Sequence, residues 1–270
     1  MSPQTSGPAR RLHLFEFEDL SWFPSLFRNA ITDWLATFVG VYEPAVPLLM
    51  KLLDQEGSDH VVDLCSGGAG PWDYLKTRLD TESQAQGGAP ISLTLTDRYP
   101  NRPAFVAVSE QIGPNVDFEE GSVDARHVPE HLKGVRTLFT SFHHLKPADA
   151  KAVLADAAQA GRSIGVFEFV QRDWRIIRDC FWQVPLSMMR SYRTWAPRRR
   201  WQTVLVPLIL LTSVWDAVVS QLRAYRADEL AAMIEELPMP GYRWETGVTF
   251  PPGASDPITY VIGYPASTDA

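Results

Sequence analysis

The sequence contains little cysteine, and its two cysteines stand far apart. Cys65 and Cys180 are the only ones among 270 residues, and neither belongs to a Cys-x-x-Cys pair or has a histidine at metal-ligand spacing. A disulfide framework or a structural zinc site needs several such ligands close together in the fold. The sequence therefore argues against both, and we expect no metal site.

Positive charge is also in deficit. The chain has 25 Lys and Arg residues against 32 Asp and Glu, which gives a net charge of −7. A protein that binds nucleic acid through its phosphates needs an excess of positive charge, so we expect no nucleic-acid partner. The first eleven residues lack the apolar stretch of a signal peptide. A cytoplasmic location is therefore the default expectation.

What the sequence does contain is an alternation of short apolar runs and helical segments between residues 60 and 170. This pattern is typical of βαβ units around a parallel sheet. Two later apolar runs, 243–250 and 258–264, are separated by too few residues for a helical crossover, so they should pair antiparallel. We predict a doubly wound, mostly parallel α/β sheet with a C-terminal antiparallel hairpin. The predicted parallel strands are 60–64, 91–96, 116–119, 137–141 and 163–169, with helices at 71–79, 103–111 and 148–159.

The most informative segment is residues 61–70, Val-Val-Asp-Leu-Cys-Ser-Gly-Gly-Ala-Gly. An apolar strand ends there in Asp63, and a loop with little side-chain bulk leads into a helix. Small residues let the backbone approach a ligand closely, and a carboxylate at the strand end suits a cationic or hydroxylated ligand. The dinucleotide fingerprint G-x-G-x-x-G is absent, because Gly68 and Gly70 would require a third glycine where Asp73 stands.

This segment resembles the first motif of class I S-adenosylmethionine-dependent methyltransferases. Three further segments resemble the family's later motifs, in the same order: 93–97, 121–125 and 138–144. The resemblance implies that the first loop wraps the amino-acid part of the cofactor, that Asp97 binds the ribose hydroxyls and that Asp124 accepts from the adenine amino group. The cofactor-binding residues that it implies are Asp63, Cys65, Gly67, Gly68, Asp97, Arg98, Asp124, Ala125, Ser141 and Phe142.

Two features depart from the family pattern. Cys65 stands where many relatives have the first glycine of the loop. The interval from Asp63 to Asp97 is longer than usual, which we attribute to a loop at 81–90.

Three side chains are candidates for a catalytic role. His143 and His144 follow the fourth predicted strand, at the sheet edge where ligands bind in open α/β folds. At least one of them could act as a general base, or one could pack on the cofactor while the other caps the next helix. Glu168 should point away from its neighbouring phenylalanines and either face the substrate or pair with an arginine such as Arg172.

The whole chain, 1–270, is predicted to be one methyltransferase domain with helical additions. The segment 12–56 is predicted as a helical lid whose Phe17 and Trp22 bind substrate, although an ordinary amphipathic helix packed on the sheet would show the same pattern. Asp216 and Ser220 share one helical face, where they could line the substrate pocket or tie helices together. The remaining parts are a flexible tail at 1–10, a cofactor-binding core at 58–170, a helical cap at 173–224 and a C-terminal helix and hairpin at 225–265.

Residues 195–214 combine arginines with the apolar run 204–211, which is too short to cross a bilayer. We favour a buried cap helix here, with a helix lying on a membrane surface as the alternative.

The predicted function is S-adenosylmethionine-dependent methylation of a small, aromatic or hydrophobic organic molecule. Two alternatives stay open: an enzyme that uses the same cofactor for a non-methyl transfer or a cyclisation, and a noncatalytic cofactor-binding module. The oligomeric state does not follow from the sequence.

Overall fold

The computed structural model describes residues 10–20, 22–196, 200–237, 239–253 and 256–266, so the predicted tail at 1–10 lies outside it apart from Arg10. The chain divides into two compact units. One, which we call the sheet unit, comprises Gly40–Phe169 and Arg226–Ala270. The other, the helical unit, comprises Met1–Val39 and Val170–Tyr225. The predicted lid therefore divides, because residues 40–56 pack with the sheet.

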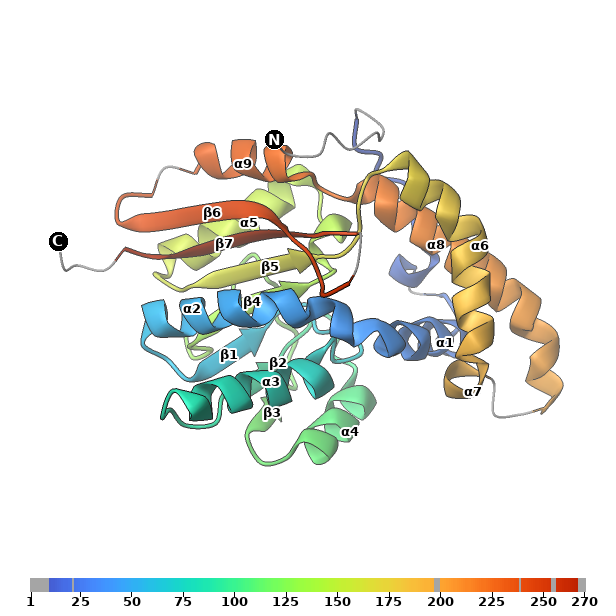
Figure 1. Ribbon diagram of the computed structural model, residues 1–270, viewed down its shortest axis with the longest axis horizontal. Coiled ribbons are helices and arrows are strands. Elements are labelled where there is room, and N and C mark those ends of the chain that lie inside the picture. The colour runs from blue at the N-terminus through green and yellow to red at the C-terminus, as the bar shows by residue number, and fades with distance from the viewer. Residues whose placement is uncertain (1–9, 21, 197–199, 238, 254–255, 267–270) are drawn as a thin grey trace. The chain divides into compact units, whose positions relative to one another are not determined.

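The sheet unit contains a seven-stranded sheet in the order β3-β2-β1-β4-β5-β7-β6 (Figure 1). β1 to β5 are parallel, and β7 runs antiparallel to both β5 and β6, which confirms the predicted fold class and hairpin. The strands are β1 (His60–Asp63), β2 (Ser92–Leu95), β3 (Val116–Phe118), β4 (Val135–Phe139), β5 (Ile164–Glu168), β6 (Tyr242–Thr249) and β7 (Ile258–Pro265).

Helices cover both faces of this sheet. α2 (Val46–Glu56), α3 (Trp72–Ala85) and α4 (Arg102–Ile112) lie on one face, and α5 (Pro147–Gln159) and α9 (Ala227–Glu235) lie on the other (Figure 1). α3 continues six residues beyond its predicted end, and Lys76 and Asp80 form an ion pair one turn apart within it. The long interval from Asp63 to Asp97 thus comes from a longer helix, and our attribution to a loop at 81–90 was wrong.

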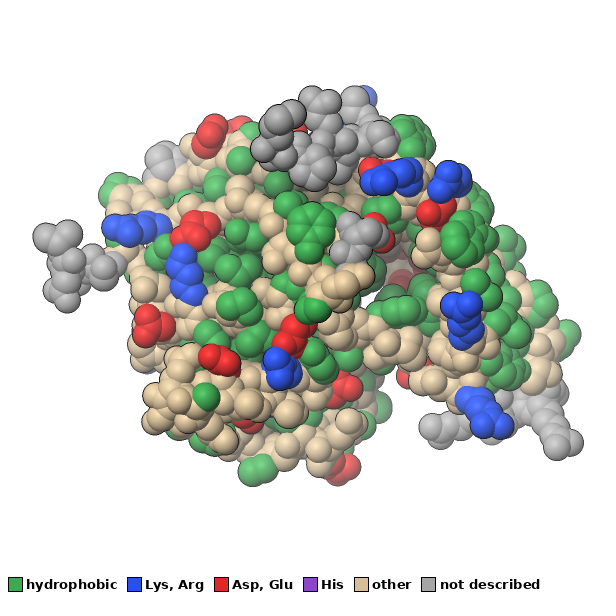
Figure 2. Space-filling view, viewed as in Figure 1, with side chains coloured by type: hydrophobic (Ala, Val, Ile, Leu, Met, Phe, Trp, Pro, Cys, Tyr) green, Lys and Arg blue, Asp and Glu red, His purple; other side chains and the backbone are tan. Residues whose placement is uncertain are grey.

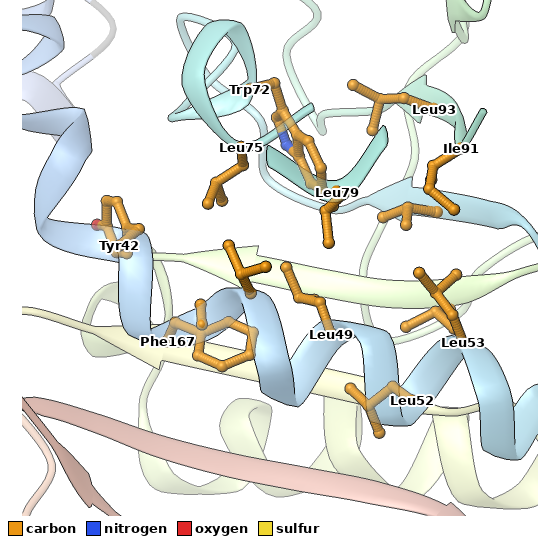
Figure 3. Close-up of a cluster of buried hydrophobic side chains, with 14 of the residues drawn as sticks. Tyr42, Leu49, Leu52, Leu53, Trp72, Leu75, Leu79, Ile91, Leu93 and Phe167 are labelled. Atoms are coloured by element: carbon orange, nitrogen blue, oxygen red, sulfur yellow. The ribbon is translucent and has the colours of Figure 1, made fainter. Parts of the chain in front are cut away.

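The core of the sheet unit lies between the sheet and helices α2 and α3. Leu49 and Leu52 of α2 point towards the strands, and Leu75 of α3 meets them from the side (Figure 3). Each is fully buried, and burying a leucine side chain contributes about 1.5–3 kcal/mol. Gly165 of β5 is needed for this contact, because a Cβ there would lie 3.0 Å from Leu52 Cδ1 and 2.8 Å from the Phe167 ring.

The helical unit packs around its own core. Its helices are η1 (Phe17–Asp19), α1 (Ser25–Leu35), α6 (Trp174–Arg190), α7 (Tyr192–Trp195), η4 (Arg200–Leu205) and α8 (Val206–Arg223). α6 and α8 run side by side (Figure 1). The buried residues that they share with α1 include Phe27, Ile31, Trp34, Cys180, Val184, Met188 and Ile209.

The segment predicted as a buried cap, 195–214, is buried on one side only. Ile209 and Thr212 are at most 5% exposed, whereas Leu208 is 48% and Leu211 is 66% exposed. The expectation of a buried run is therefore wrong for Leu208, because α8 has only one face against the rest of its unit. Of the arginines at 198–200, the first two lie outside the described residues, and the side chain of the third is not described.

Two helical stretches among the described residues are long and apolar enough to cross a membrane by length and composition, Ser25–Glu56 and Gln202–Arg223. The second has a mean hydropathy of 1.9 over its most apolar part, of which 28% is buried. Core helices of globular proteins satisfy the same criterion, so this finding is weak support for a membrane span.

Candidate functional site

The loop after β1 has an unusual backbone. Cys65 and Ala69 have φ values of 57° and 79°, in the left-handed region that favours glycine, and Gly67 and Gly70 lie in the same region. Non-glycine residues held there cost about 1–3 kcal/mol each and concentrate at ligand-binding sites. Cys65 therefore adopts a backbone conformation that glycine tolerates better than other residues. Burial raises the pKa of its thiol to about 12, so the side chain is neutral.

The backbone of this loop is open to a ligand at the two glycines. A Cβ placed on Gly67 would meet nothing closer than 4.0 Å, and one on Gly70 nothing closer than 3.8 Å. Gly68, the third glycine of the loop, is half-buried. The loop thus exposes main chain at Gly67 and Gly70, with little side-chain bulk around it.

Asp63 ends β1 below this loop. Its carboxylate is buried and accepts a hydrogen bond of 2.7 Å from Thr137 Oγ1, on the neighbouring residue of β4. Burial raises the pKa of Asp63 to about 7. The side chain thus anchors β1 to β4 at the point where the loop begins, and a contact with a cofactor stays a prediction.

Asp97 joins the loops that follow β1 and β2. One carboxylate oxygen accepts from the Gly67 N–H at 2.8 Å, and the other accepts from the Tyr99 N–H at 2.7 Å. The Asp97 carbonyl in turn accepts from the Val123 N–H at 2.9 Å. The loops after three neighbouring strands therefore meet at the carboxyl edge of the sheet, where ligands bind in open α/β folds.

Arg98 and Ser122 make a second link between these loops, because the Ser122 hydroxyl donates to the Arg98 carbonyl at 2.7 Å. The Arg98 side chain is exposed, with its guanidinium 5.9 Å from the centre of the Tyr99 ring. The structure thus brings Gly67, Asp97 and Arg98 together at this edge of the sheet, and their contact with a cofactor stays a prediction.

Asp124 has a partner that the sequence prediction missed. The Arg126 guanidinium donates to both of its oxygens, at 2.9 and 2.6 Å, and holds the pKa of this carboxyl down at about 2. Arg126 also pairs with Asp149 at 2.6 Å. Asp124 is therefore ionised and already paired with Arg126 before any ligand binds. Its neighbour Ala125 is buried.

His143 and Glu168 form a buried pair at the ends of β4 and β5. The distance from His143 Nδ1 to Glu168 Oε2 is 2.7 Å, and both side chains are 2% exposed. The other carboxylate oxygen accepts from the Phe142 N–H at 2.7 Å. Sequence reasoning named both residues but expected a substrate or an arginine beside Glu168. The observed partner is the histidine.

The remaining candidates of this edge lie around η3 (Phe142–His144). The ring centres of His143 and His144 are 4.2 Å apart, and the His144 N–H donates to the Ser141 carbonyl. The Ser141 hydroxyl is buried and has no hydrogen-bond partner among the described residues. An orphaned buried hydroxyl in such a site is a group that a bound ligand could satisfy.

Thr140 and Tyr42 are site features that the sequence did not reveal. Thr140 has a φ of 40°, which ends β4 two residues before its predicted end, and its hydroxyl bonds the Tyr42 hydroxyl. Burial raises the pKa of Tyr42. An unusual backbone angle at a threonine leaves no sequence signal, and Tyr42 lies nearly one hundred residues away in the chain.

The predicted substrate residues Phe17 and Trp22 lie on one groove of the helical unit. The groove has a volume of about 480 Å³, and Trp22 is 69% exposed at its wall. Apart from Thr212, the lining residues are apolar: Phe15, Phe17, Trp22, Phe23, Pro24, Phe27, Leu208, Leu211 and Trp215.

Asp216 and Ser220 tie helices together, which was one of their two predicted roles. The Asp216 carboxylate is buried and accepts from the Phe17 N–H at 2.7 Å and the Glu18 N–H at 3.2 Å, so it caps η1. The Ser220 hydroxyl donates to the Asp216 carbonyl at 2.8 Å and lies 3.2 Å from the Glu16 carboxylate. A pocket role for these two residues stays a prediction.

Comparison with known proteins gives no matching family model and no matching curated protein. Among solved structures, the plantazolicin methyltransferase BpumL in complex with SAH aligns over 89% of this chain and 88% of its own, with 9% identity and a TM-score of 0.50. A structure described as an O-methyltransferase from Nostoc punctiforme aligns over 90% of this chain and 62% of its own, with 16% identity and a TM-score of 0.47. One described as a Zn-dependent alcohol dehydrogenase from Rhodobacter sphaeroides aligns over 88% and 98%, with 10% identity and a TM-score of 0.47.

At this identity the first match shows that the two chains share a fold, which in this chain is the seven-stranded, mostly parallel sheet with helices on both faces.

Proposed function

We propose that this protein is an S-adenosylmethionine-dependent methyltransferase that acts on a small, hydrophobic or aromatic molecule. The observation that carries the proposal is the loop at 64–70, where Cys65 takes a glycine-like conformation and the Gly67 N–H is held by Asp97. A nicotinamide cofactor would instead call for the glycine fingerprint that the sequence lacks. The methyltransferase bound to SAH that shares this fold adds support.

The residues at the sheet edge fit this cofactor. The open backbone of Gly67 and Gly70 would face its amino-acid part, and Asp97 its ribose. Each oxygen of the Asp97 carboxylate accepts one backbone N–H and has a further lone pair for a ribose hydroxyl. Residues 123–125 would lie beside the adenine. When bound, the cofactor supplies a methyl group that is already activated by its sulfonium.

The chain's own contribution to chemistry would be positioning and proton transfer. An oxygen or nitrogen nucleophile loses a proton as it is methylated, and a base close to it speeds this step about 10²–10⁴-fold. His143 Nδ1 lies 2.7 Å from the Glu168 carboxylate, and when the ring carries its proton on Nδ1, Nε2 is the basic nitrogen. We propose His143 as that base, with Glu168 as its positioning residue and His144 as the alternative base.

The groove of the helical unit supports a hydrophobic acceptor. Its lining has no charged side chain, and six of its ten residues are aromatic. A groove of this size accommodates a small aromatic molecule. Phe17 and Trp22 are the residues that we propose for its binding.

The proposal is tested first by thermal melting with ligand. S-adenosylhomocysteine should raise the melting temperature, because a ligand that binds only the folded state stabilises it, and NAD should leave it unchanged. Incubation with methyl-labelled cofactor and a metabolite extract should then transfer label to a small molecule. Stabilisation by NAD alone would refute the cofactor assignment, whereas binding of S-adenosylhomocysteine without any labelled product would favour a noncatalytic module.

A further inference from the structure

The outward face of α6 carries large apolar side chains. Inward, Ile177, Cys180, Val184 and Met188 are at most 7% exposed, and the last three belong to the core of the helical unit. A group of exposed large apolar side chains on one face often marks a contact surface. Figure 2 shows hydrophobic side chains over this helix with basic side chains between them. The outward apolar side chains are Trp174, Phe181, Trp182, Leu186 and Met189, which are between 41% and 63% exposed.

Arginines stand among these apolar side chains. Arg175 and Arg178 are 74% and 73% exposed; they pair with Asp173 at 3.3 Å and with Asp179 at 2.7 Å. Arg190 is exposed at the end of the helix. Trp174, Arg178 and Trp182 follow one another at four-residue intervals, so this ion pair lies beside the two tryptophans. The face is therefore apolar, with three arginines against two aspartates.

The sequence from the second half of α6 to the middle of α8 is also rich in arginine. Between Cys180 and Trp215 the chain has five arginines and no acidic residue. The whole helical unit has twelve basic residues, all arginines, against seven acidic ones, whereas the rest of the chain has 13 basic and 25 acidic residues. The net charge of −7 is therefore the sum of a positive charge on the helical unit and a larger negative charge on the sheet unit. A negatively charged surface would attract the first and repel the second.

We propose that the outward face of α6 docks the protein on an anionic lipid bilayer. Trp174, Phe181 and Trp182 enter the interface between headgroups and acyl chains, where amphipathic aromatic rings are favoured, and the arginines meet lipid phosphates. This inference goes beyond the proposed function and does not depend on it.

The test is binding of the full-length protein to phosphatidylcholine vesicles with and without phosphatidylglycerol, measured by co-sedimentation. The protein should bind only the vesicles that contain phosphatidylglycerol, and added salt should weaken the binding. Phe181→Asp should reduce binding at least about tenfold, since it removes a large apolar side chain from the interface. Arg190→Ser should reduce it about fivefold, which corresponds to about 1 kcal/mol for one basic residue.

Matched controls in the sheet unit separate docking from general effects. Phe250→Asp makes the same substitution at an apolar side chain that is 49% exposed, and Arg243→Ser removes an exposed arginine. Neither should change vesicle binding. All four positions are exposed, so the melting temperatures and the response to S-adenosylhomocysteine should be unchanged. If Phe181→Asp does not fold, the comparison of Arg190→Ser with Arg243→Ser decides alone.

Failure of the wild-type protein to bind phosphatidylglycerol vesicles would overturn the proposal. So would equal losses in the α6 variants and their controls. The mass in solution, measured over a range of concentrations, tests the other occupant: a dimer that Phe181→Asp converts to a monomer, without vesicle binding, would assign this face to a second copy of the chain.

Discussion

The sheet unit buries most of its large apolar side chains, whereas the helical unit exposes many of them. Fourteen of the eighteen large apolar side chains that are exposed among the described residues belong to the helical unit, which is about a third of the chain. The sheet unit has helices on both faces of its sheet, so its apolar residues have partners in adjacent layers. The helices of the other unit each have only one face against their neighbours. The comparison shows that an apolar helix is not by itself a buried one.

The two units also differ in the partners of their charged side chains. In the sheet unit, carboxylates gather at one edge, where that of Asp97 accepts from backbone N–H groups and that of Asp124 pairs with the partly exposed Arg126. In the helical unit, the Arg223 guanidinium is buried and contacts Glu16 at 3.2 Å and Asp19 at 2.7 Å. One set leaves room for a ligand, and the other holds η1 to α8.

The largest effect that we expect comes from breaking this buried pair. Arg223→Met keeps the apolar stem but leaves the Glu16 carboxylate buried beside an uncharged side chain, which should lower the free energy of unfolding by about 3–5 kcal/mol. Arg126→Met in the sheet unit removes a cation that is 30% exposed, and should cost much less because water screens this pair. Urea unfolding of the two variants measures both values. Equal losses would show that burial does not distinguish the two networks.

The next effect distinguishes the two sides of α8. Ile209→Ala should lower the free energy of unfolding by about 2–5 kcal/mol, because the side chain is fully buried and its removal leaves a cavity. Leu211→Ala, two residues along the same helix, should change it by less than about 0.5 kcal/mol, since that side chain is 66% exposed. Urea unfolding again gives the measurement. A large loss in Leu211→Ala would mean that this side is covered in solution.

A third variant tests the sheet edge as the ligand-binding region. Asp97→Ala should weaken binding of S-adenosylhomocysteine by about 1.5–3 kcal/mol, the range for hydrogen bonds to a charged group. Isothermal titration gives the affinity. Asp117→Ala, which removes an exposed carboxylate on β3, serves as the control and should leave the affinity unchanged. Unaltered binding in a folded Asp97→Ala protein would place the ribose elsewhere.

A fourth comparison is a pH dependence of stability that differs between the units. The pKa of Asp63 is raised to about 7 and that of Glu18 to about 8, in both cases chiefly by burial. A raised carboxyl pKa stabilises the fold fully below the group's ordinary pKa, and this contribution is lost as the pH rises through the folded value. Relative to the wild type, Asp63→Asn should therefore gain stability as the pH rises from about 5 to about 7 and no further above that, whereas Glu18→Gln should continue to gain up to about pH 8.

Urea unfolding at a series of pH values between 5 and 9 would measure these two curves. Asp124 should not contribute in this range, because its pKa is lowered to about 2 and its stabilisation is lost only in acid. A difference between wild type and Asp63→Asn that does not vary with pH would show that this carboxyl titrates normally in the folded protein.

The sequence alone determined the sheet. Its short apolar runs alternate with helices, which predicts parallel strands, because parallel strands need a crossover connection. The short connection between the last two runs predicts an antiparallel pair, which a short loop can join. The same order places Asp63, Asp97 and Glu168 at one edge, since the carboxyl ends of parallel strands meet there. These residues were therefore found without the structure.

Only the tertiary structure decided which groups these residues contact and which helix faces are buried. The pairing of His143 with Glu168, and of Asp124 with Arg126, depends on rotamers and loop conformations that no spacing specifies. Whether Leu208 is buried depends on how many neighbours α8 has, and α8 is apolar over most of its circumference, so its sequence marks no inner face. Local pattern fixes the period of an element, whereas burial is a property of everything packed around it.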